Sequence, residues 1–519
     1  MYKFILILIN FTALAASAQQ NFDVLHYRYE IELTDKSDAI TAKATISVKF
    51  LMAASDVKFD LASMQDDKGM YAFQVMEGGK LLRSAHLHDE VLINLMQPAK
   101  PGEVRTFEIS YMGTPADGLI ISKNKFGDRT FFADNWPNRA HQWIPCIDRP
   151  DDKASFEFYV TAPDHYQVIS NGIRMEEKKL DQGRKLTHWK EDIALPTKVM
   201  VIGVARFAVK NYTDSPANIP VSAWVYPQDS TKGFYDYGVA PGIVRFFTDY
   251  FAPFPYKKLA NVQSKTIFGG MENAGAIFYA EQSVTGDRKW EEVLSHEIVH
   301  QWFGDMASEK SFAHLWLSEG FATYFTDLYF EKKYSADSAR KRLQKERTEV
   351  EAFVKKNGHA VVDSTSDLMS LLNENSYQKG GWVLHMLRIE TGDSIFKKII
   401  REYYQAFKGG NADTRDFEKV AERVSGKDLK WFFDQWLYQG GIPELDIKTD
   451  VDKEEVKVKI KQGNNLYRFV MEVGLLHEDG TMNLEKMEIR EREVEYKWKE
   501  RGVKKVLLDP QTRLLYMKK

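Results

Sequence analysis

The stretch that most constrains this chain is His296-Glu297-Ile298-Val299-His300. On an α-helix the two histidines lie one turn apart on the same face, so both imidazoles can reach one divalent metal ion. Glu297 is rotated away from the metal, which places its carboxylate beside a water on that metal, in the position of a general base. The pattern alone also fits a helix whose histidines form only local hydrogen bonds, so the context has to decide.

The context is a second predicted helix over residues 314–325, which carries Glu319 nineteen positions after His300. Two histidines and one glutamate leave the fourth position of a tetrahedral metal open for water. This is the ligand set of a catalytic zinc and not of a structural one. The sequence therefore predicts one Zn²⁺ per chain, held by His296, His300 and Glu319.

Length and charge narrow the class of protein. A chain of 519 residues is long enough for several domains, and 44% hydrophobic residues can form large cores. The 71 basic and 74 acidic residues give a net charge of -3. Binding of nucleic acid through a general basic field is therefore not expected, because it needs an excess of Lys and Arg.

The N-terminus resembles an export signal. Lys3 precedes an apolar run over residues 4–16, and Ala16-Ser17-Ala18 forms an A-x-A cleavage site. We expect residues 1–18 to be removed before Gln19 and the protein to be exported, either periplasmic or secreted. The alternative is an N-terminal membrane anchor, but the run is shorter than the ~20 residues that cross a bilayer. No membrane span is expected in the mature chain.

Periodicity predicts a multidomain α+β fold. Residues 19–213 alternate apolar and polar positions and predict an N-terminal antiparallel β saddle or sandwich. Helical spacing in 239–251 and 291–438 predicts a helical catalytic domain over 214–441. Alternation returns in 445–460, 469–476 and 494–498, which predicts a small C-terminal β-sandwich over 442–519. The single cysteine, Cys146, cannot pair within the chain, and an inert buried thiol is expected in preference to a catalytic one.

A predicted strand over residues 261–267 leads into Gly269-Gly270-Met271-Glu272-Asn273. Adjacent glycines let the backbone approach a ligand, and Glu272 offers an anion beside it. Together with the two metal-site segments, this motif resembles the aminopeptidase N family of zinc exopeptidases, which are gluzincins with a thermolysin-like catalytic domain. Tyr377-Gln378-Lys379-Gly380 is similar to the tyrosine motif of that family. The resemblance implies a short form without the helical C-terminal domain of large relatives.

The resemblance also implies an activity and residue roles. The protein would be a zinc-dependent aminopeptidase that acts on peptides with a free N-terminus. Glu297 would be the general base, Tyr377 would stabilise the oxyanion, and Glu272 would hold the substrate amine. The substrate-binding segment would be Gly269, Gly270, Met271, Glu272 and Asn273.

Some positions depart from the family pattern. Trp136 stands where relatives have a Gln or Glu that helps to hold the amine, and Asn135 and Asp134 are the candidates to replace it. Thr326 stands near a position where relatives usually have an acid. Two alternatives stay open: a thermolysin-like endopeptidase, and a peptide-binding relative without turnover. An epoxide hydrolase is disfavoured because residues 368–372 lack the extra acid of that branch.

Overall fold

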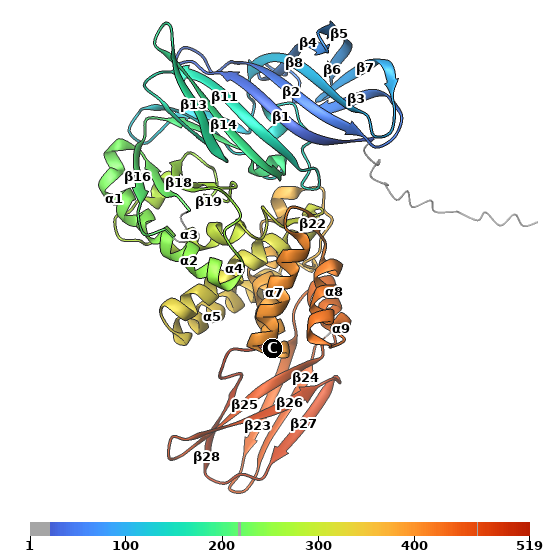
Figure 1. Cartoon of the computed structure of the whole chain (residues 1–519). Coiled ribbons are helices and arrows are strands. Elements are labelled where there is room, and N and C mark those ends of the chain that lie inside the picture. Colours follow the sequence, from blue (N-terminus) through green and yellow to red (C-terminus); the bar gives the residue numbers. More distant parts are fainter. Residues whose placement is uncertain (1–20, 216–218, 464) are drawn as a thin grey trace, which may run out of the picture.

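The computed structural model describes residues 21–215, 219–463 and 465–519, so the predicted signal peptide lies outside the described residues. The described chain forms three parts that follow one another along a long axis (Figure 1). An N-terminal β domain lies at one end, a helix-rich part lies in the middle, and a second β domain lies at the other end. This α+β arrangement confirms the fold class predicted from periodicity.

The main sheet of the N-terminal domain has eight strands in the order β13-β14-β11-β1-β2-β8-β4-β5. Alternate residues such as Tyr27, Tyr29 and Ile31 face the core, because successive side chains of a strand point to opposite faces. The pairing of β1 with β11 is parallel, so the expectation of an antiparallel sheet holds only for its other pairings. The strands are β1 Phe22–Glu32, β2 Ile40–Phe50, β4 Gly69–Glu77, β5 Lys80–Leu81, β8 Val104–Thr114, β11 Ala154–Pro163, β13 Ile173–Leu180 and β14 Arg184–Leu195.

Two smaller sheets complete this domain. They are ordered β12-β15-β10-β9 and β3-β7-β6. Phe132 of β10 packs edge-on against Phe278 of the next domain, so the two domains share a core. Cys146 is buried, and burial raises the pKa of its thiol well above the ordinary value, as expected for an unreactive packed cysteine. The strands are β3 Ala54–Asp60, β6 Arg83–Leu87, β7 Glu90–Ala99, β9 Leu119–Lys123, β10 Arg129–Ala133, β12 Gln167–Ser170 and β15 Ile202–Ala205.

The middle part begins with a five-stranded sheet in the order β16-β17-β18-β20-β19. Its edge strand β19 is Gly270–Met271, which pairs antiparallel with β20. The glycine-rich segment found in the sequence is therefore the edge of a sheet, where backbone groups stay free for a ligand. The remaining strands are β16 Ala208–Tyr212, β17 Val221–Val225, β18 Leu259–Ser264 and β20 Ala276–Ala280.

The helices of the middle part pack around α4, whose residues 316–329 are all buried. A helix that is buried on every side belongs to the centre of a domain. Phe321 and Phe325 of α4 contact Phe303, which follows α3. The helices are α1 Ser230–Asp236, α2 Ala240–Tyr250, α3 Glu291–His300, α4 Trp316–Lys333, α5 Ala336–Val354, α6 Gly380–Thr391, α7 Asp393–Phe407, α8 Thr414–Ser425 and α9 Lys430–Phe433, with a short parallel pair of strands, β21 Ser308–Glu309 and β22 Asn411–Ala412.

The C-terminal domain consists of two sheets, ordered β27-β24-β23-β29 and β26-β25-β28. Val456, Val458 and Ile460 of β24 are buried and alternate with less buried residues, as the period of two in the sequence predicted. The Lys379 ammonium of the middle part donates to the carbonyl oxygen of Gly441, 2.8 Å away, where this domain begins. The strands are β23 Glu444–Val451, β24 Val456–Gln462, β25 Phe469–His477, β26 Met482–Ile489, β27 Glu493–Trp498, β28 Val503–Leu508 and β29 Met517–Lys518.

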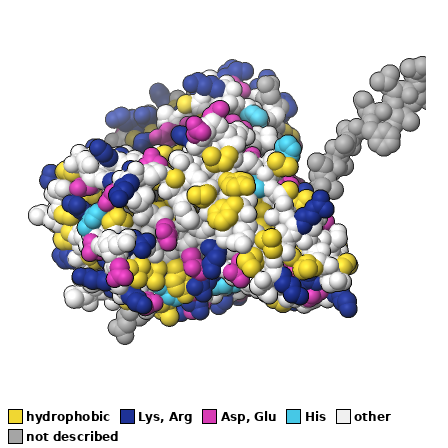
Figure 2. All heavy atoms as spheres, turned by 90° about the horizontal axis from the view of Figure 1, so that it is seen from above, with side chains coloured by type: hydrophobic (Ala, Val, Ile, Leu, Met, Phe, Trp, Pro, Cys, Tyr) yellow, Lys and Arg dark blue, Asp and Glu magenta, His cyan; other side chains and the backbone are white. Residues whose placement is uncertain are grey.

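The face of the molecule seen from the N-terminal domain carries basic and acidic side chains side by side (Figure 2). Charges of both signs that are mixed in this way give no extended basic field. The observation agrees with the near-neutral composition of the chain. Among the described residues, no helix combines the length and the apolar character needed to cross a membrane.

Two glycine substitutions test the packing of α4. A Cβ atom on Gly320 would lie 2.8 Å from the backbone of Gly380, so α4 and α6 must separate in Gly320→Ala. We expect a loss of about 1–3 kcal/mol of stability and a lower melting temperature in calorimetry. Gly242→Ala in α2 is the control, because a Cβ there meets nothing within 4 Å and alanine favours the helix by roughly 0.5–1 kcal/mol. Equal melting of Gly320→Ala and the wild type would contradict the close contact.

Candidate functional site

Helix α3 presents His296 and His300 on one face, as their spacing predicted. The Nε2 atoms of the two rings lie 3.1 Å apart. Glu319, in the first turn of α4, brings Oε2 to 3.2 Å from His296 Nε2 and 3.3 Å from His300 Nε2. The structure therefore brings the three predicted metal ligands together.

These separations fit a tetrahedral metal site. Zinc binds histidine nitrogen and carboxylate oxygen at about 2.0–2.2 Å, which places ligand atoms of a tetrahedron about 3.3–3.6 Å apart. The three separations in the structure, 3.1, 3.2 and 3.3 Å, lie at or within 0.2 Å of the lower end of that range. Two nitrogens and one carboxylate oxygen are also a donor set that zinc accepts. The residues present thus fit a zinc ion with one open position.

The chain around α3 and α4 orients His300. Its Nδ1 atom lies 3.1 Å from the carbonyl oxygen of Phe303 and 3.0 Å from Ser318 Oγ. A carbonyl oxygen can only accept, so Nδ1 carries the proton and Nε2 keeps its lone pair for a metal. Ser318 precedes Glu319, so the two ligand segments support each other.

Glu297 packs against the glycine-rich edge strand. A Cβ atom on Gly270 would overlap the Glu297 carboxylate, so only glycine lets β19 lie this close to the base. The Glu297 side chain is buried, and burial raises the pKa of its carboxyl well above the ordinary value. A carboxylate with a raised pKa is a better proton acceptor, as general-base chemistry needs.

Glu272 reaches the same cavity from the loop after β19. It is 5% exposed, and its Oε1 atom has no hydrogen-bond partner among the described residues. Burial raises the pKa of its carboxyl, while the neighbouring His300 lowers it. A buried carboxylate oxygen without a donor is costly unless a ligand supplies one. Glu272 is thus available for a cationic group of a ligand.

Gln301 joins this loop to α3 and was not predicted from the sequence. Its side-chain amide donates to the carbonyl oxygen of Glu272 at 2.7 Å and accepts from the Gly275 backbone N–H at 2.7 Å. It also donates to Asp305 at 3.1 Å. Because Gln301 directly follows His300, it fixes the distance between the metal ligands and Glu272. The only signal in the sequence was a polar residue next to the second histidine.

Tyr377 lies over the metal ligands. It belongs to a short π-helix, Asn375–Lys379, that leads into α6. Its ring stacks on the His296 ring with centroids 5.8 Å apart and planes 10° apart. Burial raises the pKa of its phenol well above the ordinary value, and the nearby carboxylates add to the rise. Tyr377 therefore keeps its proton and can act as a hydrogen-bond donor.

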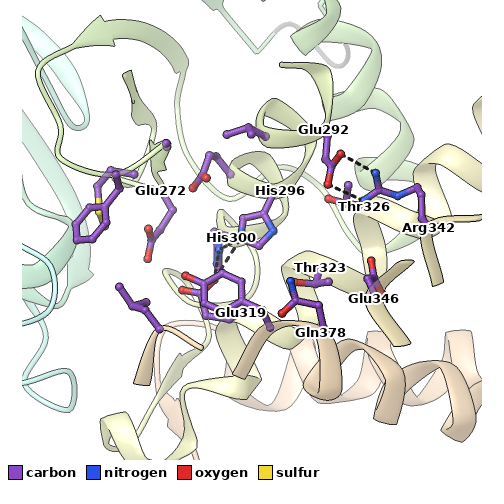
Figure 3. A pocket seen from close by; sticks show the side chains of 18 of the residues that line it. Glu272, Glu292, His296, His300, Glu319, Thr323, Thr326, Arg342, Glu346 and Gln378 are labelled. Carbon is purple, nitrogen blue, oxygen red and sulfur yellow. Dashed lines mark hydrogen bonds and ion pairs between the residues drawn. The ribbon is translucent and has the colours of Figure 1, made fainter. Parts of the chain in front are cut away.

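The three metal ligands, together with Glu272, Glu297 and Tyr377, line one cavity of about 380 Å³ (Figure 3). Asn273 is an exception among the predicted site residues, because it is buried and is not part of the lining. Residues that line the cavity include both the metal ligands and the glycine-rich segment: Trp136, Phe268, Gly269, Gly270, Met271, Glu272, Glu292, Val293, His296, Glu297, His300, Glu319, Thr323, Thr326, Arg342, Lys345, Glu346, Glu349, Leu372, Tyr377 and Gln378.

Asn135 and Asp134, the two candidates for the missing amine contact, do not line the cavity and form hydrogen bonds within the fold. The Asn135 amide donates to backbone carbonyls of residues 197 and 200, and its oxygen accepts from Trp143. Asp134 accepts from Thr266 and from the Ile267 backbone N–H. Both side chains therefore form hydrogen bonds that stabilise the fold. Trp136 lines the cavity instead and packs against Phe268 and Phe312, so it forms an apolar wall.

Comparison with known proteins identifies relatives of the N-terminal β domain and of the middle, helix-rich part. The Peptidase family M1 domain matches residues 235–436, and the Peptidase M1 N-terminal domain matches residues 24–199. Probable aminopeptidase 2 of Sulfurisphaera tokodaii is 27% identical over 355 residues, which are 63% of this chain and 44% of that protein. Aminopeptidase M1-A of Oryza sativa subsp. japonica is 26% identical over 459 residues, 83% of this chain and 52% of that protein.

Solved structures share the fold. Aminopeptidase A of Legionella pneumophila, solved in complex with aspartic acid, superposes with a TM-score of 0.83 at 19% identity, over 98% of this chain and 60% of that chain. An M1 zinc metallopeptidase of Deinococcus radiodurans superposes with a TM-score of 0.71 at 22% identity, over 82% of this chain and 95% of that chain. The chain spans only about half, or less, of the length of the curated relatives described above.

Proposed function

Since two domains of peptidase family M1 together match more than half of this chain, the chain belongs to that family, and we propose that it is a zinc-dependent aminopeptidase. The observation that carries the proposal is that one cavity contains a metal-binding set, a candidate general base and a candidate amine-binding group. His296, His300 and Glu319 form a metal-binding set, Glu297 lies beside them, and Glu272 holds an unpaired buried oxygen. The aminopeptidase names of its relatives support the same activity.

The residues of the cavity take complementary roles in peptide hydrolysis. Zinc held by His296, His300 and Glu319 would polarise the scissile carbonyl and make water a nucleophile near neutral pH. Glu297 accepts the proton of the attacking water and delivers it to the departing nitrogen, so the proton is conserved and the peptide bond breaks. The Tyr377 hydroxyl donates a hydrogen bond to the carbonyl oxygen as negative charge develops there.

Glu272 supplies the selection for a free N-terminus. An α-amine has a reference pKa of about 7.7–8.0 and is therefore largely protonated at neutral pH. Its ammonium group would satisfy the unpaired Oε1 of Glu272 and offset the charge of this carboxylate. Because Gln301 ties the Glu272 backbone to the metal helix, the ammonium and the scissile bond are held at a fixed separation.

Two substitutions test the catalytic roles. Glu297→Gln keeps the size of the side chain but cannot accept a proton, so we expect normal zinc content and a loss of activity of about 10²–10⁴-fold. Tyr377→Phe should lower kcat by about 10²–10³-fold with a much smaller change in KM, because the hydroxyl acts mainly in the transition state.

Tyr404→Phe on α7 is the matched control, because Tyr404 does not line the cavity, and its kinetics should equal those of the wild type. Full activity of Glu297→Gln on an aminoacyl anilide would exclude Glu297 as the base. An unchanged kcat of Tyr377→Phe would remove Tyr377 from the mechanism.

One peptide with a free and with an acetylated N-terminus separates an aminopeptidase from an endopeptidase. Acetylation removes the positive charge and leaves the buried Glu272 carboxylate without a partner. We expect at least about a hundredfold lower kcat/KM for the acetylated peptide. Equal cleavage of both peptides would instead support the endopeptidase alternative, and no cleavage of either by zinc-loaded protein would support a binding protein.

We further infer that the protein is exported, to the periplasm or the medium. The support is the sequence alone, in which Lys3, the apolar run over residues 4–16 and the A-x-A site form a signal-peptide pattern. Mass spectrometry of the exported protein checks the inference, since a chain that still begins at Met1 would contradict it.

A further inference from the structure

The cavity extends past His296 on the side away from Glu272. Figure 3 shows Glu272 on one side of the histidines and Glu292, Arg342 and Glu346 on the other. If Glu272 holds the substrate amine, as the proposed function requires, a peptide bound across the metal site directs its second residue towards this far side. The residues there are therefore in a position to contact the side chain of the residue that follows the scissile bond.

Arg342 of α5 is the most prominent cation on this side, but its charge is already balanced. Its Nη1 and Nη2 atoms lie 2.8 and 3.0 Å from the two carboxylate oxygens of Glu292. Its Nε atom donates to Asp327 Oδ1 at 2.5 Å. A guanidinium held by two carboxylates in this bidentate way has little charge left for a ligand. Arg342 is thus part of the wall and is not a free anion-binding group.

Glu346, one turn along α5 from Arg342, is different. Its side chain lines the cavity and is 6% exposed. The Asp327 carboxyl is buried behind it, and the two carboxyls form a side-chain hydrogen bond with each other. Burial raises the pKa of both carboxyls, that of Asp327 to about 6, so the two can share one proton and still carry one negative charge.

The rest of this side does not neutralise that charge. Glu349 also lines the cavity, and its nearest cation is Lys345 at 3.6 Å. The Lys345 side chain is 75% exposed, so this surface ion pair is weak. Glu292, the Asp327–Glu346 pair and Glu349 therefore outweigh Arg342 and Lys345. The far side of the cavity thus carries a net negative charge.

We propose that this side of the cavity is a specificity pocket for peptides whose second residue is Lys or Arg, with Glu346 as the main partner of the cationic group. A long basic side chain suits the pocket, because its methylene stem can pack against Val293 while its charged end reaches the acidic side chains. An acidic second residue would face Glu346 and Glu349 and be repelled.

Three peptides that differ only at the second residue test the proposal: Ala-Lys, Ala-norleucine and Ala-Glu at the N-terminus, followed by the same sequence. Norleucine keeps the apolar stem of lysine without its charge. With the zinc-loaded wild-type enzyme, release of alanine should show a kcat/KM for lysine about tenfold or more above that for norleucine, because a charge-assisted hydrogen bond forms. The glutamate peptide should be the poorest substrate.

The variant Glu346→Gln keeps the shape of the side chain and can donate a hydrogen bond to Asp327, but it removes the charge. The ratio of lysine to norleucine kcat/KM should then fall to about one to three. Glu351→Gln is the matched control, because Glu351 lies on the same helix but not in the lining, and the ratio should stay at the wild-type value.

The outcomes separate this proposal from the proposed function. Hydrolysis of all three peptides with equal efficiency, or with glutamate preferred, would overturn the specificity pocket and leave the aminopeptidase intact. If Glu346→Gln keeps the preference for lysine, other residues cause this preference, and the role of Glu346 is overturned. No hydrolysis of any of the peptides would overturn the proposed function and, with it, the pocket.

Discussion

Three glutamates, Glu272, Glu297 and Glu319, extend buried side chains into one cavity, and their mutual repulsion is the constraint on which the site depends. Burial and the neighbouring carboxylates raise the pKa of Glu272 and Glu297, whereas His300 and His296 hold the pKa of Glu319 below its ordinary value, so the cavity favours a cation that can enter. His296 and His300 confine a metal to one position, next to Glu319. The charge of Glu272 is left for a second cation, and a protonated amine has the right chemistry.

The packing of the helices in the middle part keeps these groups together. Phe303 and the buried aromatic residues of α4 hold α3 and α4 in contact, and Gly320 allows α6 to approach, with the π-helix that carries Tyr377 directly before it. Gly270 lets the edge strand lie against Glu297. Each of these contacts joins segments far apart in the sequence, so the geometry of the site is set by packing and not by any local motif.

The difference between local motifs and tertiary packing explains how much could be predicted from the sequence. The helical spacing of His296 and His300 follows from helix geometry, and the period of two revealed both β domains. The role of Gln301 and the charged wall formed by Arg342 and Glu346 depend on tertiary contacts that no periodicity records. Asn135 is instructive, because its polarity suggested a ligand contact, whereas the fold uses its amide for backbone carbonyls.

The location of the metal tests the account most directly, because two overlapping groups could in principle hold it: His296, His300 and Glu319, or Glu272, Glu297 and His300. A crystal of the zinc-loaded protein, measured at the zinc absorption edge, locates the ion by its anomalous signal. We predict one peak at about 2.0–2.2 Å from His296 Nε2, His300 Nε2 and a Glu319 oxygen, with Glu297 and Glu272 not bound to it. A peak coordinated by Glu272 and Glu297 would contradict the account, because the base and the amine-binding group would then both be occupied by the metal.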